Sequence, residues 1–386
     1  MTNGYAVIIG IGERGTGMSR GLISETGYEP AAETGIALPA KVHSIQLMRA
    51  IAAMLVVLFH VHQAFAIRFT PPFFAVESYL FAFGAVGVHI FFVISGFIMV
   101  YTNPPGKVFA AKTFFRRRLL RIYPIYWLCA ALYVAVHVLI GQAYHIDARE
   151  AAGALLLLPG NASSIIGPAW TLAFEMYFYL CFGLAMLAGS GRGLIILIGF
   201  FTISVAAGAV LPIDHPVWTL VTSSLLIEFI AGATIGWLLV AGKLPSRGGL
   251  TITMTAIILF GAGIAAGYER VPSVVMWGVP SVLLILGLAM HEAARAPSAL
   301  VRKLGHFGDS SYALYLIHIL LVTLAIELAR QIPWLADQPP ALIAIPFALA
   351  ALLVAEFLHH RVEKRMLGWL TPRRKPPLPL VQTGHP

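Results

Sequence analysis

Charged residues are scarce in this chain of 386 residues. Asp, Glu, Lys and Arg together make up 11% of it, whereas soluble domains carry about a quarter. Hydrophobic residues make up 59%, and the mean hydropathy is +0.83. This shortage of charge excludes an ordinary soluble domain and predicts a membrane protein with several spans.

Cysteine is also scarce, and several catalytic motifs are missing. The two cysteines, Cys129 and Cys181, lie in apolar segments, so we expect packing residues and neither a disulfide nor a metal site. The sequence contains no H-E-x-x-H, G-x-S-x-G or Walker A motif, which removes support for a zinc protease, a serine hydrolase or an ATPase. We expect no metal.

The few charges that are present are mostly positive, with a net charge of +9 and a pI near 9.7. In a membrane protein the excess of Lys and Arg in cytoplasmic loops explains such a balance, so we do not expect nucleic-acid binding.

The first forty residues contain no apolar core suited to a signal peptide. Gly10, Gly12 and Gly15 form a G-x-G-x-x-G, but too few residues follow for the strands and helix of a nucleotide-binding unit. We therefore expect a cytoplasmic, disordered tail at 1–40, a transmembrane domain at 41–360, and a basic, proline-rich cytoplasmic tail at 361–386.

Ten apolar runs are long enough to cross a bilayer as helices, so the predicted fold is an all-α bundle of about ten transmembrane helices. We place them near residues 45–67, 81–101, 122–141, 171–188, 193–211, 217–240, 250–267, 273–290, 311–330 and 341–358. With both termini cytoplasmic, all Lys and Arg residues except Arg68, Arg149, Arg270 and Arg330 fall on the inner side.

The first run carries two ionisable residues, Arg49 and His60, in the stretch RAIAAMLVVLFH. Eleven residues make about three helical turns, so both side chains share one helix face, roughly 16 Å apart along the axis. Buried ionisable residues in a span indicate a functional site. The alternative is an interfacial anchor for Arg49 and a packing role for His60.

Six cations follow the second run: Lys107, Lys112, Arg116, Arg117, Arg118 and Arg121. They suit either anionic lipid headgroups or a polyanionic cofactor such as a coenzyme A phosphate. In the fourth run, Glu175 is a carboxylate in an aromatic setting, and the predicted orientation puts it near the outer face.

The ninth run begins SSYALYLIH, and its spacing puts Ser311, Tyr315 and His318 near one another on one face. Glu228, Glu327 and Glu356 are further ionisable residues in apolar runs, and each is explained as well by a partner on a neighbouring helix.

Taken together and in this order, four stretches resemble the acyltransferase-3 family of integral membrane acyltransferases, most closely its exopolysaccharide-production branch, the ExoZ-like proteins. They are Arg49-x10-His60, GVHIFFVISGF (87–97), FRRRLLRIYPIYW (115–127), and PAWTLAFEMYFYL with SSYALYLIH. The resemblance runs from about residue 43 to 360. Many members carry Asp where this chain has His89, so a role for that acid does not transfer.

The resemblance implies an enzyme of the bacterial inner membrane that moves an acyl group, usually acetyl from acetyl-CoA, to a carbohydrate hydroxyl. The family's essential arginine and histidine fall on Arg49 and His60, and its span-four carboxylate on Glu175. Its basic signature falls on Arg117, Arg118 and Arg121, which we assign to acyl-CoA.

The expected partners are membrane lipid, acyl-CoA, and a polysaccharide or lipid-linked oligosaccharide acceptor. His60 would act as general base or as a transient acyl carrier, roles that a largely neutral imidazole can fill near pH 7. The sequence also fits two other hypotheses. The protein could be a polysaccharide or lipid transporter whose buried charges line a pathway, or a structural partner of polysaccharide-export machinery.

The distribution of basic residues makes a prediction about topology. Reporter fusions at Pro386 should show a cytoplasmic C-terminus, and fusions near Ile146 should show a loop on the opposite side. A periplasmic C-terminus would contradict the orientation.

Overall fold

The structure, a computed structural model, describes residues 41–69, 80–106, 108–142, 145–267 and 271–370. The predicted tail at 1–40 and the residues after 370 lie outside these ranges. The α-helices are α1 (His43–Arg68), α3 (Val86–Thr102), α4 (Ala111–Leu139), α5 (Ala148–Leu155), α6 (Trp170–Ala185), α7 (Ser190–Val210), α8 (Pro216–Val221), α9 (Leu226–Val240), α10 (Gly249–Ala266), α11 (Val279–Ala294), α12 (Ala299–Gly305), α13 (Ser311–Gln331), α14 (Pro333–Ala336), α15 (Pro340–Leu358) and α16 (Lys364–Leu370).

Short 3-10 turns lie at Phe83–Ala85, Gly167–Ala169, Met186–Ala188 and His306–Gly308. Two π-helical turns, Val274–Gly278 and His359–Glu363, precede α11 and α16. The last span therefore continues past residue 360 as one helical segment to Leu370.

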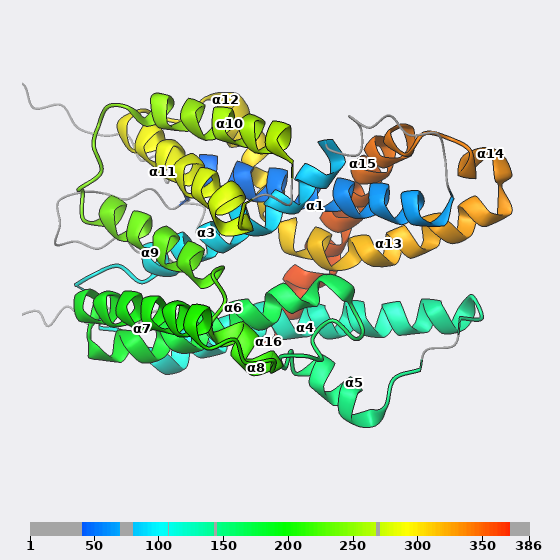
Figure 1. The fold of residues 1–386 in the computed structure, drawn as a ribbon, viewed down its shortest axis with the longest axis horizontal. Helices are drawn as coiled ribbons and strands as arrows, with labels where there is room; N and C mark the ends of the chain where they lie inside the picture. The colour runs from blue at the N-terminus through cyan, green and yellow to red at the C-terminus, as the bar shows by residue number, and fades with distance from the viewer. Residues whose placement is uncertain (1–40, 70–79, 107, 143–144, 268–270, 371–386) are drawn as a thin grey trace, which may run out of the picture.

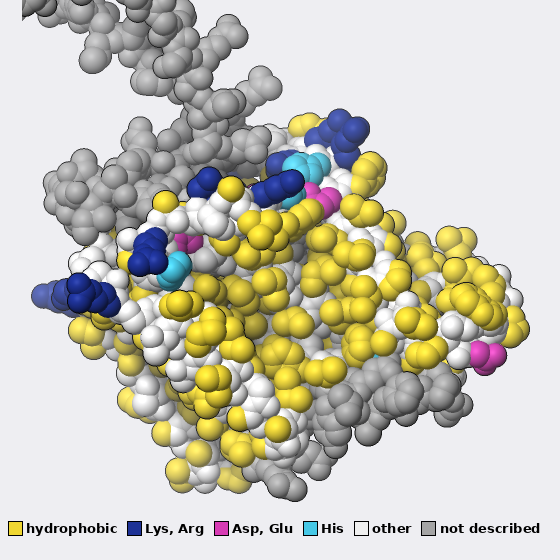
Figure 2. All heavy atoms as spheres, turned by 90° about the horizontal axis from the view of Figure 1, so that it is seen from above, with side chains coloured by type: hydrophobic (Ala, Val, Ile, Leu, Met, Phe, Trp, Pro, Cys, Tyr) yellow, Lys and Arg dark blue, Asp and Glu magenta, His cyan; other side chains and the backbone are white. Residues whose placement is uncertain are grey.

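Ten helical segments among the described residues are long and apolar enough to cross a membrane, which confirms the predicted fold class (Figure 1). Hydrophobic side chains cover most of the face drawn in Figure 2, and its cations gather along one edge. The side on which the termini lie stays a prediction.

Helix α1 packs against α3, α13 and α15. Its 26 residues span about 39 Å, enough to cross the hydrocarbon core. The buried positions recur at helical spacing, and several of them are alanines that let neighbouring helices approach. They are Ile45, Arg49, Ala50, Ala52, Ala53, Val56, Val57, Val61, His62 and Phe65.

Helices α3 and α9 pack closely against each other, and glycine permits it. A methyl group on Gly96 would collide with the backbone oxygen of Phe229, and one on Gly232 with that of Val93. Small residues allow membrane helices to come this close, since lipid supplies little hydrophobic drive for association.

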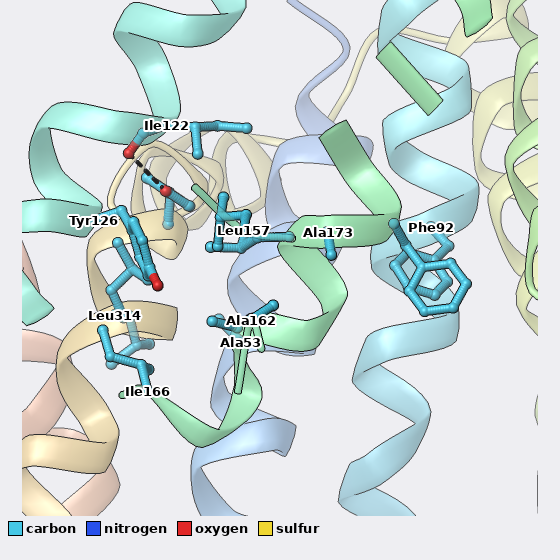
Figure 3. Close-up of a cluster of buried hydrophobic side chains, with 14 of the residues drawn as sticks. Ala53, Phe92, Ile122, Tyr126, Leu157, Ala162, Ile166, Ala173 and Leu314 are labelled. Carbon is cyan, nitrogen blue, oxygen red and sulfur yellow. Dashed lines mark hydrogen bonds between the residues drawn. The ribbon is translucent and has the colours of Figure 1, made fainter. Parts of the chain in front are cut away.

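The connection between the predicted spans 122–141 and 171–188 lies partly inside the protein. Several side chains from 154 to 169 pack in the hydrophobic core. Figure 3 shows Leu157, Ala162 and Ile166 among side chains of α1, α4, α6 and α13. We call residues 154–169 the inserted segment.

Side chains of α4 supply hydrogen-bond donors to the last carbonyls of α5, where the inserted segment begins. The hydroxyl groups of Tyr123 and Tyr126 donate to the carbonyls of Leu156 and Ala154 at 3.1 and 2.8 Å. The indole N–H of Trp127 donates to the carbonyl of Leu155 at 2.9 Å. The last carbonyls of a helix have no partner within it, so in a membrane domain they need such donors. Apolar periodicity alone did not reveal these contacts.

A second difference concerns α4, which was expected to begin near residue 122. It begins at Ala111, so the basic stretch FRRRLLR lies on the first turns of the helix. The arginines therefore have fixed directions around a helix axis.

The α3–α9 contact can be tested with two glycine substitutions. Gly96→Ala should destabilise the protein by about 1–3 kcal/mol, because backbone cannot move aside as a flexible side chain can. Gly199→Ala in α7 is the matched control, because nothing lies within 4 Å of the added methyl group; there alanine should stabilise the helix by about 0.5–1 kcal/mol. Thermal unfolding in detergent measures both. A Gly96→Ala variant as stable as the control would contradict this packing.

Candidate active site

Two histidines from different helices meet in the interior. Nε2 of His318 on α13 lies 3.4 Å from Nδ1 of His60 on α1, and the ring centroids are 5.0 Å apart. His318 is fully buried and His60 is half-buried. The sequence singled out both residues, but it did not show that they form a pair.

Backbone carbonyls set the protonation pattern of this pair. Nδ1 of His60 lies 2.8 Å from the carbonyl oxygen of Val56, and Nδ1 of His318 lies 3.3 Å from that of Leu314. A carbonyl only accepts, so each Nδ1 carries the hydrogen and each Nε2 keeps a lone pair. His60 Nε2 is then free to act as a base.

Tyr315 connects the histidine pair to α6. Its ring centroid is 5.8 Å from that of His318. Its hydroxyl donates to the carbonyl of Pro168 at 2.8 Å and accepts from the Thr171 hydroxyl at 2.6 Å. Of the three residues predicted to share a face of α13, Tyr315 and His318 lie side by side. Ser311 instead donates to the carbonyl of Gly308 at 2.7 Å.

Arg49 belongs to a second group of polar residues, and it lies on α1 three turns before His60. Its side chain is 8% exposed and donates to the side-chain oxygen of Gln46 at 2.9 Å. It also lies within electrostatic range of Glu175, Arg121 and Asp309. The structure therefore brings together residues of α1, α4 and α6 that are far apart in sequence.

Glu175 and Tyr179 form the α6 side of this group. The Glu175 carboxylate accepts from the hydroxyl groups of Tyr179 and of Ser95, the latter at 3.3 Å. The Tyr179 ring faces the guanidinium of Arg118 at 5.4 Å from the ring centroid, within the range of a cation–π contact.

The three arginines predicted to bind the cofactor do not act alike. Arg118 and Arg121 turn inward and are partly buried, whereas Arg117 is exposed. Exposed Arg116 donates to the carbonyl of Leu370 at 2.7 Å. Three residues along a helix return to nearly the same face, but one residue turns by about 100°. The spacing of Arg118 and Arg121 in the sequence therefore already indicated that they share a helix face and that Arg117 does not.

We call Arg49, Arg118, Arg121, Glu175 and Tyr179 the inner arginine cluster. Arg118 donates from Nη2 to the Thr102 hydroxyl at 3.2 Å, but its buried Nε has no hydrogen-bond partner in the described part of the chain. Three guanidinium groups around one carboxylate leave an excess of positive charge. A phosphate group fits that excess, because guanidinium forks match its oxygens.

The contacts of Glu175 relate its depth to α3 and α4. Its partner Ser95 is seven residues before the end of α3, and nearby Arg118 is seven residues after the start of α4, each about 10 Å from a helix end on the basic side. These contacts put Glu175 beside residues of the basic end of the bundle; the side of the membrane on which it lies stays a prediction.

His89, which stands where many relatives of the resemblance carry Asp, also has a partner. Its Nδ1 lies 2.6 Å from Oε1 of Glu228, and both side chains are buried. The pair joins α3 to α9 beside the glycine contact. Glu228 is therefore explained as the hydrogen-bond partner of His89 on the neighbouring helix.

The N-terminus of α1 is fixed by a carboxylate. Glu292 at the end of α11 accepts hydrogen bonds from the backbone N–H groups of His43 and Ser44, both at 2.6 Å. Free N–H groups at a helix start favour such an anion. This contact holds α1 in position at the end that carries Arg49.

Asp309 strengthens the same end of the molecule. Its carboxylate pairs with Lys41 at 2.9 Å. Burial alone would raise the pKa of Asp309, but the hydrogen bond and charge of Lys41, together with the charges of Arg49 and His359, hold that pKa below its ordinary value. The carboxylate therefore stays ionised near the inner arginine cluster.

The sequence of this chain is similar to those of known acyltransferases. Residues 42–360 match the family model described as an acyltransferase domain. The exopolysaccharide production protein ExoZ of Rhizobium meliloti is 31% identical over 251 residues, covering 63% of this chain and 78% of ExoZ. The acyltransferase MdmB of Streptomyces mycarofaciens is 25% identical over 333 residues, covering 76% and 83% of the two chains. No solved structure matches significantly.

Proposed function

Since this chain belongs to the acyltransferase family that residues 42–360 match, we propose that it transfers an acyl group, normally acetyl, from acyl-CoA to a hydroxyl of a surface polysaccharide or its lipid-linked precursor. As an O-acyltransferase whose described residues include ten helices long and apolar enough to cross a membrane, it would act in the bacterial inner membrane.

One observation carries this proposal: helix α1 holds a buried arginine in a cationic cluster and, three turns further on, a histidine with a free ring nitrogen. The two residues lie roughly 16 Å apart along the axis. One end of the helix suits an anionic group, and the middle suits proton transfer. These are the two requirements of acyl transfer from a phosphorylated thioester carrier.

The acyl donor is assigned to the inner arginine cluster. Arg49, Arg118 and Arg121 would hold phosphate oxygens, and the long pantetheine arm would extend along α1 to place the thioester near His60. Arg118 Nε, buried and without a partner in the described residues, supplies one unused donor. Glu175 would restrict the cluster by holding Tyr179 and Ser95 in place.

His60 would act as the general base. Its Nε2 takes the proton of the acceptor hydroxyl while the hydroxyl oxygen attacks the thioester carbonyl. The carbon–sulfur bond breaks, the new ester forms, and the coenzyme A thiolate leaves with the proton returned from Nε2. His60 Nδ1–H keeps its contact with the Val56 carbonyl, and His318 Nε2 beside it favours the protonated ring.

The acceptor assignment draws on the relative ExoZ, whose name states a part in exopolysaccharide production. A carbohydrate hydroxyl is a weak acid, so its attack on a thioester benefits from a base held in a water-poor interior. The buried position of the histidine pair provides that environment.

The role of His60 can be tested by substitution. His60→Ala should lower acetyl transfer by about 10²–10⁴, the usual contribution of a general base. His318→Ala should lower it less, by about tenfold, because it removes only a partner of His60. Labelled acetyl-CoA and polysaccharide, added to membranes with matched amounts of each variant, measure the rates.

His62→Phe is the matched control. His62 is buried two residues away and stacks on Phe81 with the ring centroids 4.6 Å apart, so a phenyl ring keeps that contact. The control should retain activity within a few-fold. Activity of His60→Ala at the level of this control would exclude the base.

The inner arginine cluster makes a separate prediction. Arg118→Lys with Arg121→Lys keeps the charge and the topology but removes the bidentate forks. The double variant should need at least about tenfold more acetyl-CoA for half-maximal rate, as should Arg49→Lys. Exposed Arg117→Lys should leave the acetyl-CoA dependence unchanged. Equal curves for all the variants would assign these arginines to lipid contact and topology.

A further inference from the structure

A cavity of about 300 Å³ lies at the start of α6, apart from the inner arginine cluster. The inserted segment forms one wall, and the connection from α7 into α8 forms another; Figure 1 shows α8 beside α6. In the ten-span arrangement both connections lie at the end opposite the basic residues. The volume is at the lower end of the range for small-ligand sites.

The walls of this cavity combine one aromatic face with polar side chains. Trp170, the first residue of α6, is 39% exposed although it packs on Phe174 with ring centroids 5.8 Å apart. Ser163 and Asp214 line the cavity, exposed and without a partner among the described residues. Thr219, whose hydroxyl donates to the carbonyl of His215 at 3.3 Å, also lines it. An amphipathic aromatic side chain beside free hydrogen-bonding groups suits a ring with one apolar and one hydroxylated surface.

Charge excludes the acyl donor from this place. The lining contains no Lys or Arg and one carboxylate, Asp214, so the phosphate groups of acyl-CoA would be repelled. A neutral molecule rich in hydroxyl groups would instead donate hydrogen bonds to that carboxylate.

The shape of the cavity depends on a glycine. Gly160 has φ +87°, a conformation that other residues rarely adopt, and an added methyl group would lie 3.0 Å from Cβ of Pro216. The two walls therefore meet at a position where a side chain would push them apart.

The cavity is connected to the histidine pair through neighbouring residues. Trp170 is followed by Thr171, whose hydroxyl bonds to Tyr315, and Tyr315 lies beside His318. The first turn of α6 would therefore separate a ligand in the cavity from the reacting groups at the histidine pair. A polymer can occupy such a place with sugar units next to the one that reacts.

We propose that the cavity between the inserted segment and α8 is a carbohydrate subsite for the acceptor, with Trp170 stacking on a sugar ring and Asp214 accepting its hydroxyl groups. This inference rests on the proposed function for its part in catalysis, but binding can be measured without transfer.

The test uses surface polysaccharide from the cell that encodes this chain, cut to short labelled oligosaccharides. Equilibrium dialysis with the purified protein in detergent, without acetyl-CoA, should show binding that weakens about tenfold or more in Trp170→Ala and in Asp214→Asn. Trp170→Phe should keep most of the binding, because it keeps an aromatic face and the contacts with neighbouring rings.

Trp334→Ala and Asp337→Asn are the matched controls. Both residues are exposed, and they lie in the connection between α13 and α15 at the same end of the molecule. They should bind like the unaltered protein. In transfer assays, the cavity variants should raise the half-saturating acceptor concentration and leave the acetyl-CoA dependence unchanged.

The outcomes separate the two proposals. Binding lost only in the cavity variants, with no ester formed by the unaltered protein, would support the subsite and contradict the proposed transfer. Unchanged binding in Trp170→Ala and Asp214→Asn, or no binding by the unaltered protein, would overturn the subsite. Equal losses in the variants and the controls would also overturn it.

Discussion

The arrangement of this protein depends on one constraint: a polar group in an apolar interior needs a partner. His60 meets His318, Glu175 meets Tyr179, and His89 meets Glu228. The first pair joins α1 to α13 and the third joins α3 to α9, while the bond from Ser95 to Glu175 joins α3 to α6. Removal of a partner would leave a buried group without a hydrogen bond, which makes the site and the fold hard to separate.

The inserted segment follows the same rule and has the largest effect on the site. Three donors from α4 and one from Tyr315 bond to its carbonyls. With those bonds made, side chains of the segment can pack in the core directly before α6 begins. Trp170 at the start of α6 then lies at the cavity, and Glu175 further along the same helix lies in the inner arginine cluster. One loop thereby places residues of both proposed substrate sites.

Much of this could be predicted from the sequence, because length and apolarity decide which segments span a membrane. The ten spans and the shared face of Arg49 and His60 needed only helix geometry. The depth of Glu175 and the partner of His60 needed contacts between distant segments, which a single sequence does not show. Helical phase alone separates Arg117 from Arg118 and Arg121. It could therefore have been predicted from the sequence that Arg117 points outward and the other two inward.

The proposed function places the two substrates at opposite ends of the bundle, with the histidine pair between them. Proteoliposomes containing the protein in one orientation test this most directly, with labelled acetyl-CoA and polysaccharide supplied separately to either side. The account predicts ester only when acetyl-CoA is on the side of Arg118 and Arg121 and polysaccharide is on the side of Trp170. Ester formed with both substrates confined to the side of Trp170 would contradict it.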